Sequence, residues 1–247
     1  MLERLIQYML SHSNPGSPPT SKWRDTRRNA VRWYSWPRMA TVMSPPGGDV
    51  VLYDVSWRTY ESLLNDFVDR SSPRLSYAQG TLAIKSPTKQ HEEFNRVLAL
   101  LVDTASDELG LDVQSLGSTT FRREDLGRGF EPDSCFYFAK AAHVRGKDKV
   151  DLSIDPPPEL VIEIDITSSS LPKDTIYATL GVPEVWRYDG NVLRIGLLVD
   201  GNYVESKESA VISLLTADAL SRFVQLSGTA TRPELLRTFR EWIRSRQ

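Results

Sequence analysis

Hydrophobic and polar residues alternate along several short stretches of the chain, most regularly between positions 160 and 166. One set of alternate positions is entirely apolar: Leu160, Ile162, Ile164 and Ile166. The other set contains two acids: Val161, Glu163 and Asp165. Successive side chains of a β-strand point to opposite faces. The pattern therefore predicts a buried strand on which two carboxylates and a valine share one face.

A second buried strand is predicted between Phe130 and Phe138, where the same alternation holds. One face carries Asp133, Cys135 and Tyr137, and the other carries Ser134, Phe136 and Phe138. An ionised carboxylate in a buried strand is costly unless a positive charge accompanies it. If Asp133, Glu163 and Asp165 converge, we expect a hard divalent cation such as Mg²⁺ or Mn²⁺ among them.

Helical periodicity and turn residues predict the remaining elements. Amphipathic helices are expected at 56–69, 89–109, 173–180, 217–226 and 233–246. A hairpin turns at Gln79-Gly80, and an antiparallel meander follows in 185–205. A strand at 111–121 and a polar loop at 122–129 complete the prediction. These elements indicate an α/β domain with a mixed central sheet, helices on its faces, and a hairpin and meander extension.

Charge divides the chain into two parts. The whole chain has 30 basic and 32 acidic residues, but residues 1–44 alone have seven basic and two acidic ones. We interpret 1–44 as a basic, disordered N-terminal extension and 45–247 as the folded domain. The alternative is a tail that contacts nucleic acid through its basic residues and Trp23, Trp33 and Trp36. Residues 45–247 then have 23 basic and 30 acidic residues, so this part of the chain has no general basic field for a nucleic acid.

The single cysteine, Cys135, excludes a disulfide within the chain, and we expect it in the core. No apolar run approaches the length of a membrane span. We therefore expect a cytoplasmic protein that does not interact with membranes.

Several other polar residues are candidates for a site. Glu92, in the first turn of the helix at 89–109, either reaches a metal or is favoured there by the helix dipole. His91 is expected to cap the helix or make a polar contact, and contact with the substrate is the alternative. Arginines at positions 122, 123 and 128 could hold a nucleic-acid phosphate, or could lie on a solvated hairpin tip. The same choice applies to Arg145, Lys147 and Lys149.

The order Pro-Asp followed about thirty residues later by Glu-x-x resembles the PD-(D/E)XK nuclease superfamily. Four longer segments are similar to the Uma-two family of restriction-endonuclease-like proteins: SPTKQHEEFNR, LGSTTFRREDLGRGFEPDSCFYF, PPPELVIEIDITSSSL and IYATLGVPEVWRYDG. The resemblance implies a restriction-endonuclease-like fold and an Mg²⁺- or Mn²⁺-dependent endonuclease that hydrolyses DNA, expected as a homodimer. It implies metal ligands at Asp133, Glu163 and the Ile164 carbonyl, with Glu92 nearby.

The chain departs from the superfamily motif at Asp165, where a lysine is usual. The resemblance makes Lys173 the substitute, which would steady water or phosphate, while Asp165 would add or orient a metal ligand. An exposed first-turn lysine is the alternative for Lys173. Two other functions stay open: a catalytically inactive nuclease-fold module that binds nucleic acid or protein, and a phosphoesterase acting on small nucleotides.

Overall fold

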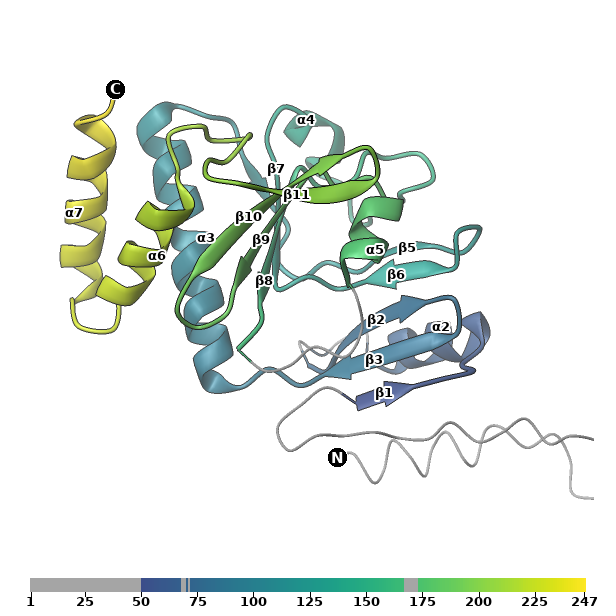
Figure 1. Ribbon diagram of the computed structural model, residues 1–247. Helices are drawn as coiled ribbons and strands as arrows, with labels where there is room; N and C mark the ends of the chain where they lie inside the picture. Colours follow the sequence, from purple (N-terminus) through teal and green to yellow (C-terminus); the bar gives the residue numbers. More distant parts are fainter. Residues whose placement is uncertain (1–49, 68–69, 71, 167–172) are drawn as a thin grey trace, which may run out of the picture. The chain divides into compact units, whose positions relative to one another are not determined.

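The computed structural model describes residues 50–67, 70, 72–166 and 173–247. The prediction of a basic extension at residues 1–44 lies outside these described residues. The polypeptide forms two β-sheets and several helices, and the predicted α/β class is confirmed (Figure 1).

The first sheet is antiparallel and is built mostly from the N-terminal part of the described chain. Its strand order is β1-β3-β2-β6-β5. The bounds are Val50–Leu52 (β1), Arg74–Ala78 (β2), Thr81–Lys85 (β3), Phe121–Arg123 (β5) and Arg128–Phe130 (β6). The β2–β3 hairpin turns at Gln79 and Gly80, which both have positive φ as a tight two-residue turn requires. The predicted hairpin is confirmed, but it belongs to this separate sheet.

The second sheet is mixed and contains both acid-bearing strands. Its order is β11-β10-β9-β8-β7-β4, with only β8 and β9 parallel. The bounds are Gln114–Ser115 (β4), Ser134–Tyr137 (β7), Leu160–Ile164 (β8), Glu184–Tyr188 (β9), Leu193–Val199 (β10) and Asn202–Ser206 (β11). The predicted meander is β9, β10 and β11.

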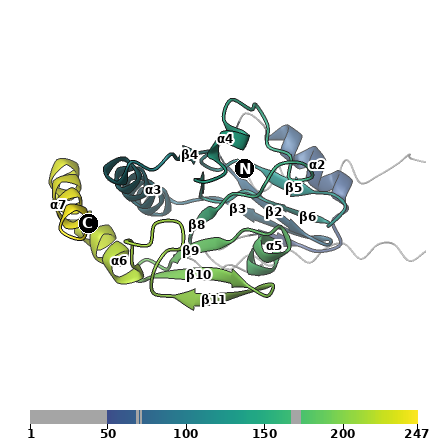
Figure 2. The same ribbon diagram turned by 90° about the horizontal axis from the view of Figure 1, so that it is seen from above.

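Helices cover both sheets. Their bounds are Trp57–Asp66 (α2), Lys89–Leu109 (α3), Ala141–Val144 (α4), Lys173–Thr179 (α5), Ala217–Leu226 (α6) and Arg232–Arg244 (α7). The long helix α3 begins at its Thr88 cap, which accepts from the His91 backbone N–H, and ends at Gly110 in the left-handed conformation. Helices α3, α6 and α7 lie together on one side of the mixed sheet (Figure 2).

The predicted alternation of the two buried strands is confirmed by two separate cores. Leu160, Ile162, Ile164 and Phe136 pack with α3, α6 and α7. Val161, Cys135 and Tyr137 belong to the other core, which also contains residues of α5 and of the antiparallel sheet. Cys135 is fully buried, and burial raises the pKa of its thiol to about 12.

The prediction for residues 111–129 is wrong in its details. The expected strand at 111–121 is only β4, because Gly117 takes a positive φ that extended backbone cannot continue. Residues 122–129, expected as a polar loop with a hairpin tip as the alternative for its arginines, form the end of the β5–β6 hairpin. Its turn is closed by the Gly127 N–H, which donates to the Glu124 carbonyl at 2.9 Å. The polar residues of 122–129 therefore belong to the antiparallel sheet and to the turn of this hairpin.

Helix α2 packs on the antiparallel sheet through a close contact between Tyr60 and Gly129. The Tyr60 ring stacks on Tyr77 of β2, with centroids 5.0 Å apart. A Cβ atom at position 129 would overlap the Tyr60 ring and hydroxyl. Glycine is therefore required at this position by the approach of a buried aromatic side chain.

Candidate active site

Asp133 and Glu163 meet at one end of the mixed sheet. Asp133 directly precedes β7, and the antiparallel register that pairs Ser134 with Ile162 sets Asp133 opposite Glu163 when it is extended by one residue. Both acids are buried, with 2% and 0% of their surface exposed. Two carboxylates at this depth need positive partners.

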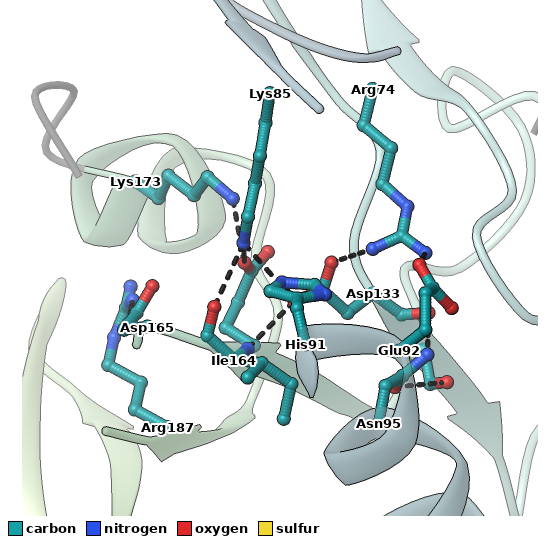
Figure 3. Close-up of polar contacts among 12 residues, drawn as sticks. Arg74, Lys85, His91, Glu92, Asn95, Asp133, Ile164, Asp165, Lys173 and Arg187 are labelled. Atoms are coloured by element: carbon teal, nitrogen blue, oxygen red, sulfur yellow. Dashed lines mark hydrogen bonds and ion pairs between the residues drawn. The ribbon is translucent and has the colours of Figure 1, made fainter. Parts of the chain in front are cut away.

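Asp133 is surrounded by donors from four elements (Figure 3). Arg74 donates to Oδ1, and the Lys85 ammonium lies 3.3 Å from Oδ2. The Ile164 backbone N–H donates to Oδ2 at 2.7 Å, and His91 Nε2 lies 2.9 Å from the same oxygen but is not aligned as a good hydrogen-bond donor. Burial raises the pKa of Asp133, but the contact with His91 and the charges of Lys85, Arg74 and Lys173 outweigh it and hold the pKa well below its usual value.

Glu163 has its own partners on helix α5. The Lys173 ammonium donates to Oε2 at 2.6 Å, and the Tyr177 hydroxyl donates to Oε1. Lys173 is buried, so the alternative of an exposed lysine is wrong. Burial lowers the pKa of Lys173, but the charges of Glu163 and Asp133 outweigh this and raise the pKa, so the ammonium stays protonated.

Three of the predicted metal-ligand oxygens converge on a single nitrogen, the Lys85 Nζ. It lies 2.9 Å from the Ile164 carbonyl, 3.3 Å from Asp133 Oδ2 and 3.9 Å from Glu163 Oε2. The two carboxylate oxygens are therefore no farther apart than the sum of the last two distances. Within residues 50–67, 70, 72–166 and 173–247, no three His, Cys, Asp or Glu side chains are grouped as a metal site. The cluster instead has two carboxylates and a carbonyl.

Helix α3 holds the other side of the cluster. Glu92 Oε1 accepts from Arg74 Nη2 at 2.6 Å, so a guanidinium separates Glu92 from Asp133. Asn95 donates to the Asp133 backbone carbonyl at 3.0 Å and accepts from the Ser134 hydroxyl. These contacts fix the backbone at the point where β7 begins.

Asp165 turns away from the other two acids. Arg187, the residue that β9 places beside Glu163, donates from Nη1 to Asp165 Oδ2 at 2.7 Å. A second contact ties the same guanidinium to Asp174. The three-carboxylate convergence expected from the alternation is therefore reduced to Asp133 and Glu163 (Figure 3).

The predicted phosphate-binding arginines lie outside this cluster. Arg122 pairs with Glu61 at 3.2 Å, and Arg123 Nε donates to Asp125 at 2.7 Å. Arg128 pairs with Ala78, at the opposite end of β2 from Arg74. All three belong to the β5–β6 hairpin. In the second candidate loop, Arg145 and Lys147 make ion pairs with acidic side chains.

Arg74 and Lys85 were missed by the sequence reasoning, although a signal for them exists. The two-residue turn at Gln79-Gly80 pairs Ala78 with Thr81, and the same register pairs Arg74 with Lys85. Directly paired residues project from the same face of a sheet. Two cations on one face at the end of a largely buried hairpin indicate that acids lie against it.

A cleft of about 900 Å³ gives access to one side of the cluster. Arg74, Glu92 and Asp133 are among its lining residues, as are Arg96 of α3 and Arg232 of α7. Arg96 and Arg232 are exposed, and their guanidinium groups have no ion-pair partner in the described part of the chain. The cleft therefore presents two unpaired cations beside the buried acids.

Comparison with known proteins finds a matching family model and a matching solved structure. Residues 57–227 match the family model Uma2, described as "Putative restriction endonuclease". One solved structure that matches is described as "a putative nuclease belonging to DUF820" from Anabaena variabilis, with a TM-score of 0.46 and 12% sequence identity over 65% of this chain and 98% of that chain. Among curated proteins, no match is found. In the part of the chain that is described, every helix is too short or too polar to cross a membrane.

Proposed function

The chain belongs to the Uma2 family, written Uma-two above. We therefore propose that it hydrolyses phosphodiester bonds in DNA at the cluster of Asp133 and Glu163. One observation carries this proposal. Asp133, just before β7, and Glu163 and the Ile164 carbonyl, at the end of β8, direct three oxygens at one cation, the Lys85 ammonium. A position that attracts an ammonium ion is electrostatically suited to a metal cation.

The donor set fits Mg²⁺ or Mn²⁺, which prefer oxygen ligands and commonly take one or two carboxylates with several waters. Asp133, Glu163 and Ile164 would hold the ion. When bound, such an ion would polarise the phosphoryl oxygen and make a bound water more acidic.

The surrounding residues have distinct roles in this proposal. Arg74 fixes the orientation of Asp133, and Tyr177 fixes that of Glu163, each by a hydrogen bond to one carboxylate oxygen. Lys173 supplies the positive charge that the superfamily motif has two residues after the glutamate, and its raised pKa keeps that charge at neutral pH. A protonated lysine beside the reacting phosphate would stabilise negative charge that develops during hydrolysis.

We propose that the cleft between α3 and α7 receives the DNA backbone. Arg96 and Arg232 line it, and arginine binds phosphate oxygens through two parallel N–H donors. Arg122, Arg123 and Arg128 would then act only on a substrate long enough to reach the β5–β6 hairpin. The homodimer and the cytoplasmic location expected from the sequence remain predictions.

The test is cleavage of a panel of DNA and RNA substrates with Mg²⁺ or Mn²⁺, together with calorimetric titration of the metal. Glu163→Gln should abolish cleavage and weaken Mn²⁺ binding, because it removes one ligand charge. Asp125→Asn is the matched control, since Asp125 is an exposed acid paired with an arginine away from the cluster. Circular dichroism of each variant checks that it is folded.

A specific observation favours a second function, that of an inactive nuclease-fold binding module. Arg74, Lys85 and Lys173 already balance the charges of Asp133, Glu163 and Glu92. If the folded wild-type protein neither binds metal nor cleaves any substrate of the panel, the nuclease proposal fails and the binding module is favoured.

A further inference from the structure

The Lys85 ammonium lies among the three oxygens to which we assign the metal. Its shortest contact, 2.9 Å, is with the Ile164 carbonyl, and the two carboxylate oxygens follow at 3.3 and 3.9 Å. Only 11% of the side chain is exposed. An ammonium ion and a divalent ion cannot share this point, because both would need the same oxygens and would repel each other.

The fold directs Lys85 to this point. It is the last residue of β3, and its cross-strand partner Arg74 projects from the same face. Two like charges placed directly opposite destabilise a sheet unless acids lie between or beside them. Here Asp133 contacts both cations, and Glu92 contacts Arg74. The antiparallel sheet thus joins the mixed sheet through these ion pairs.

The charge of the cluster leads to the same conclusion. Apart from His91, which also contacts Asp133, three acids and three basic side chains face one another, and their charges cancel without a metal. Adding a divalent ion while every lysine stays in place would leave two uncompensated positive charges in a buried site, which is strongly unfavourable. Of the three basic side chains, only Lys85 contacts all three of the proposed ligand oxygens.

We propose that Lys85 is an internal cation that occupies the divalent-ion position in the metal-free protein and must withdraw before the ion binds. This inference rests on the proposed metal site. The flexible four-carbon stem of lysine lets the ammonium move while the strand stays in place. The chain is therefore stable without metal, and divalent ions bind only in competition with Lys85.

Lys85→Met in the full chain tests the proposal, because methionine keeps much of the volume and removes the charge. The dissociation constant for Mn²⁺, measured by calorimetry, should fall by at least about tenfold, equivalent to about 1.4 kcal/mol. The melting temperature in EDTA should fall, and Mn²⁺ should restore it. The wild-type melting temperature should be the same in EDTA and in buffer without chelator.

Lys89→Met is the matched control, since Lys89 is an exposed lysine that pairs with Glu93 on the surface of α3. It should leave both measurements unchanged. If Lys85→Met does not fold, Lys85→Gln replaces it, because the amide can still donate to the Ile164 carbonyl and carries no charge.

Two results would overturn the inference in distinguishable ways. An Mn²⁺ affinity that is equal or weaker in the folded Lys85 variant refutes competition by Lys85 and leaves the nuclease proposal standing. Absence of Mn²⁺ binding to both the wild type and the folded variant refutes the metal site itself, and with it both proposals.

Discussion

Replacing Asp133 by asparagine tests how the charge cluster contributes to folding. Asp133 accepts from Arg74 on Oδ1 and from Lys85 and the Ile164 N–H on Oδ2. Whichever way an asparagine amide is turned, its NH₂ group faces one of these donors. The substitution therefore removes the charge and also sets a donor against a donor at a buried position.

The expected loss is large because the partners of Asp133 are buried with it. Breaking a buried ion pair from one side costs about 3–5 kcal/mol, since the remaining charge stays uncompensated. In a domain of this size each kcal/mol lowers the melting temperature by about 2–4 °C, so Asp133→Asn should melt roughly 6–20 °C below the wild type. Relief of repulsion between acids in the metal-free state is the smaller effect, because three cations already separate them.

The stability difference should also depend on pH. The pKa of Asp133 is lowered in the folded protein, so its contribution is complete above the unfolded pKa of about 3.9. The contribution is lost as the pH falls through the folded pKa, because the wild-type side chain then becomes neutral too. The gap between wild type and Asp133→Asn should therefore be wider at pH 5 than at pH 3.

Differential scanning calorimetry in EDTA at these two pH values measures the gap. Asp125→Asn serves as the control, because its pair with Arg123 is exposed and surface pairs contribute at most about 1 kcal/mol. A melting temperature for Asp133→Asn within about 2 °C of the wild type at pH 5 would refute this account of the cluster, given the size of the effect expected for a buried pair.

Two further predictions concern residues beside the cluster and in the antiparallel sheet. Asp165→Lys should not create the superfamily's lysine site, because it sets a cation against Arg187. Urea denaturation should show a loss of stability of about 1 kcal/mol, small because the pair is partly exposed, and cleavage should not increase. Gly129→Ala should cost about 1–3 kcal/mol through overlap with Tyr60. Tyr60→Phe removes the nearest overlapping atom, a buried hydroxyl without a hydrogen-bond partner among the described residues, and should recover part of that loss. Equal stability of Gly129→Ala with and without Tyr60→Phe would count against the overlap.

The sequence determined the features that depend on neighbouring residues. Alternation assigned the faces of β7 and β8, because side chains of a strand must alternate. Periodicity gave the bounds of α3, and the Gln79-Gly80 turn gave the hairpin. The register of that turn also pairs Arg74 with Lys85, although this pairing was not among the predictions. Long similar segments gave the family.

Only the tertiary structure decided which charges meet. Arg74 and Lys85 reach Asp133 across 59 and 48 residues, and such contacts depend on loop paths that no local pattern specifies. The structure also separated the hairpin from the mixed sheet and paired Asp165 with Arg187, because β8 ends at Ile164 and the neighbouring strand β9 carries Arg187. Strand alternation could place the acids on one face, but the position of each cation was set by the packing of one sheet against the other.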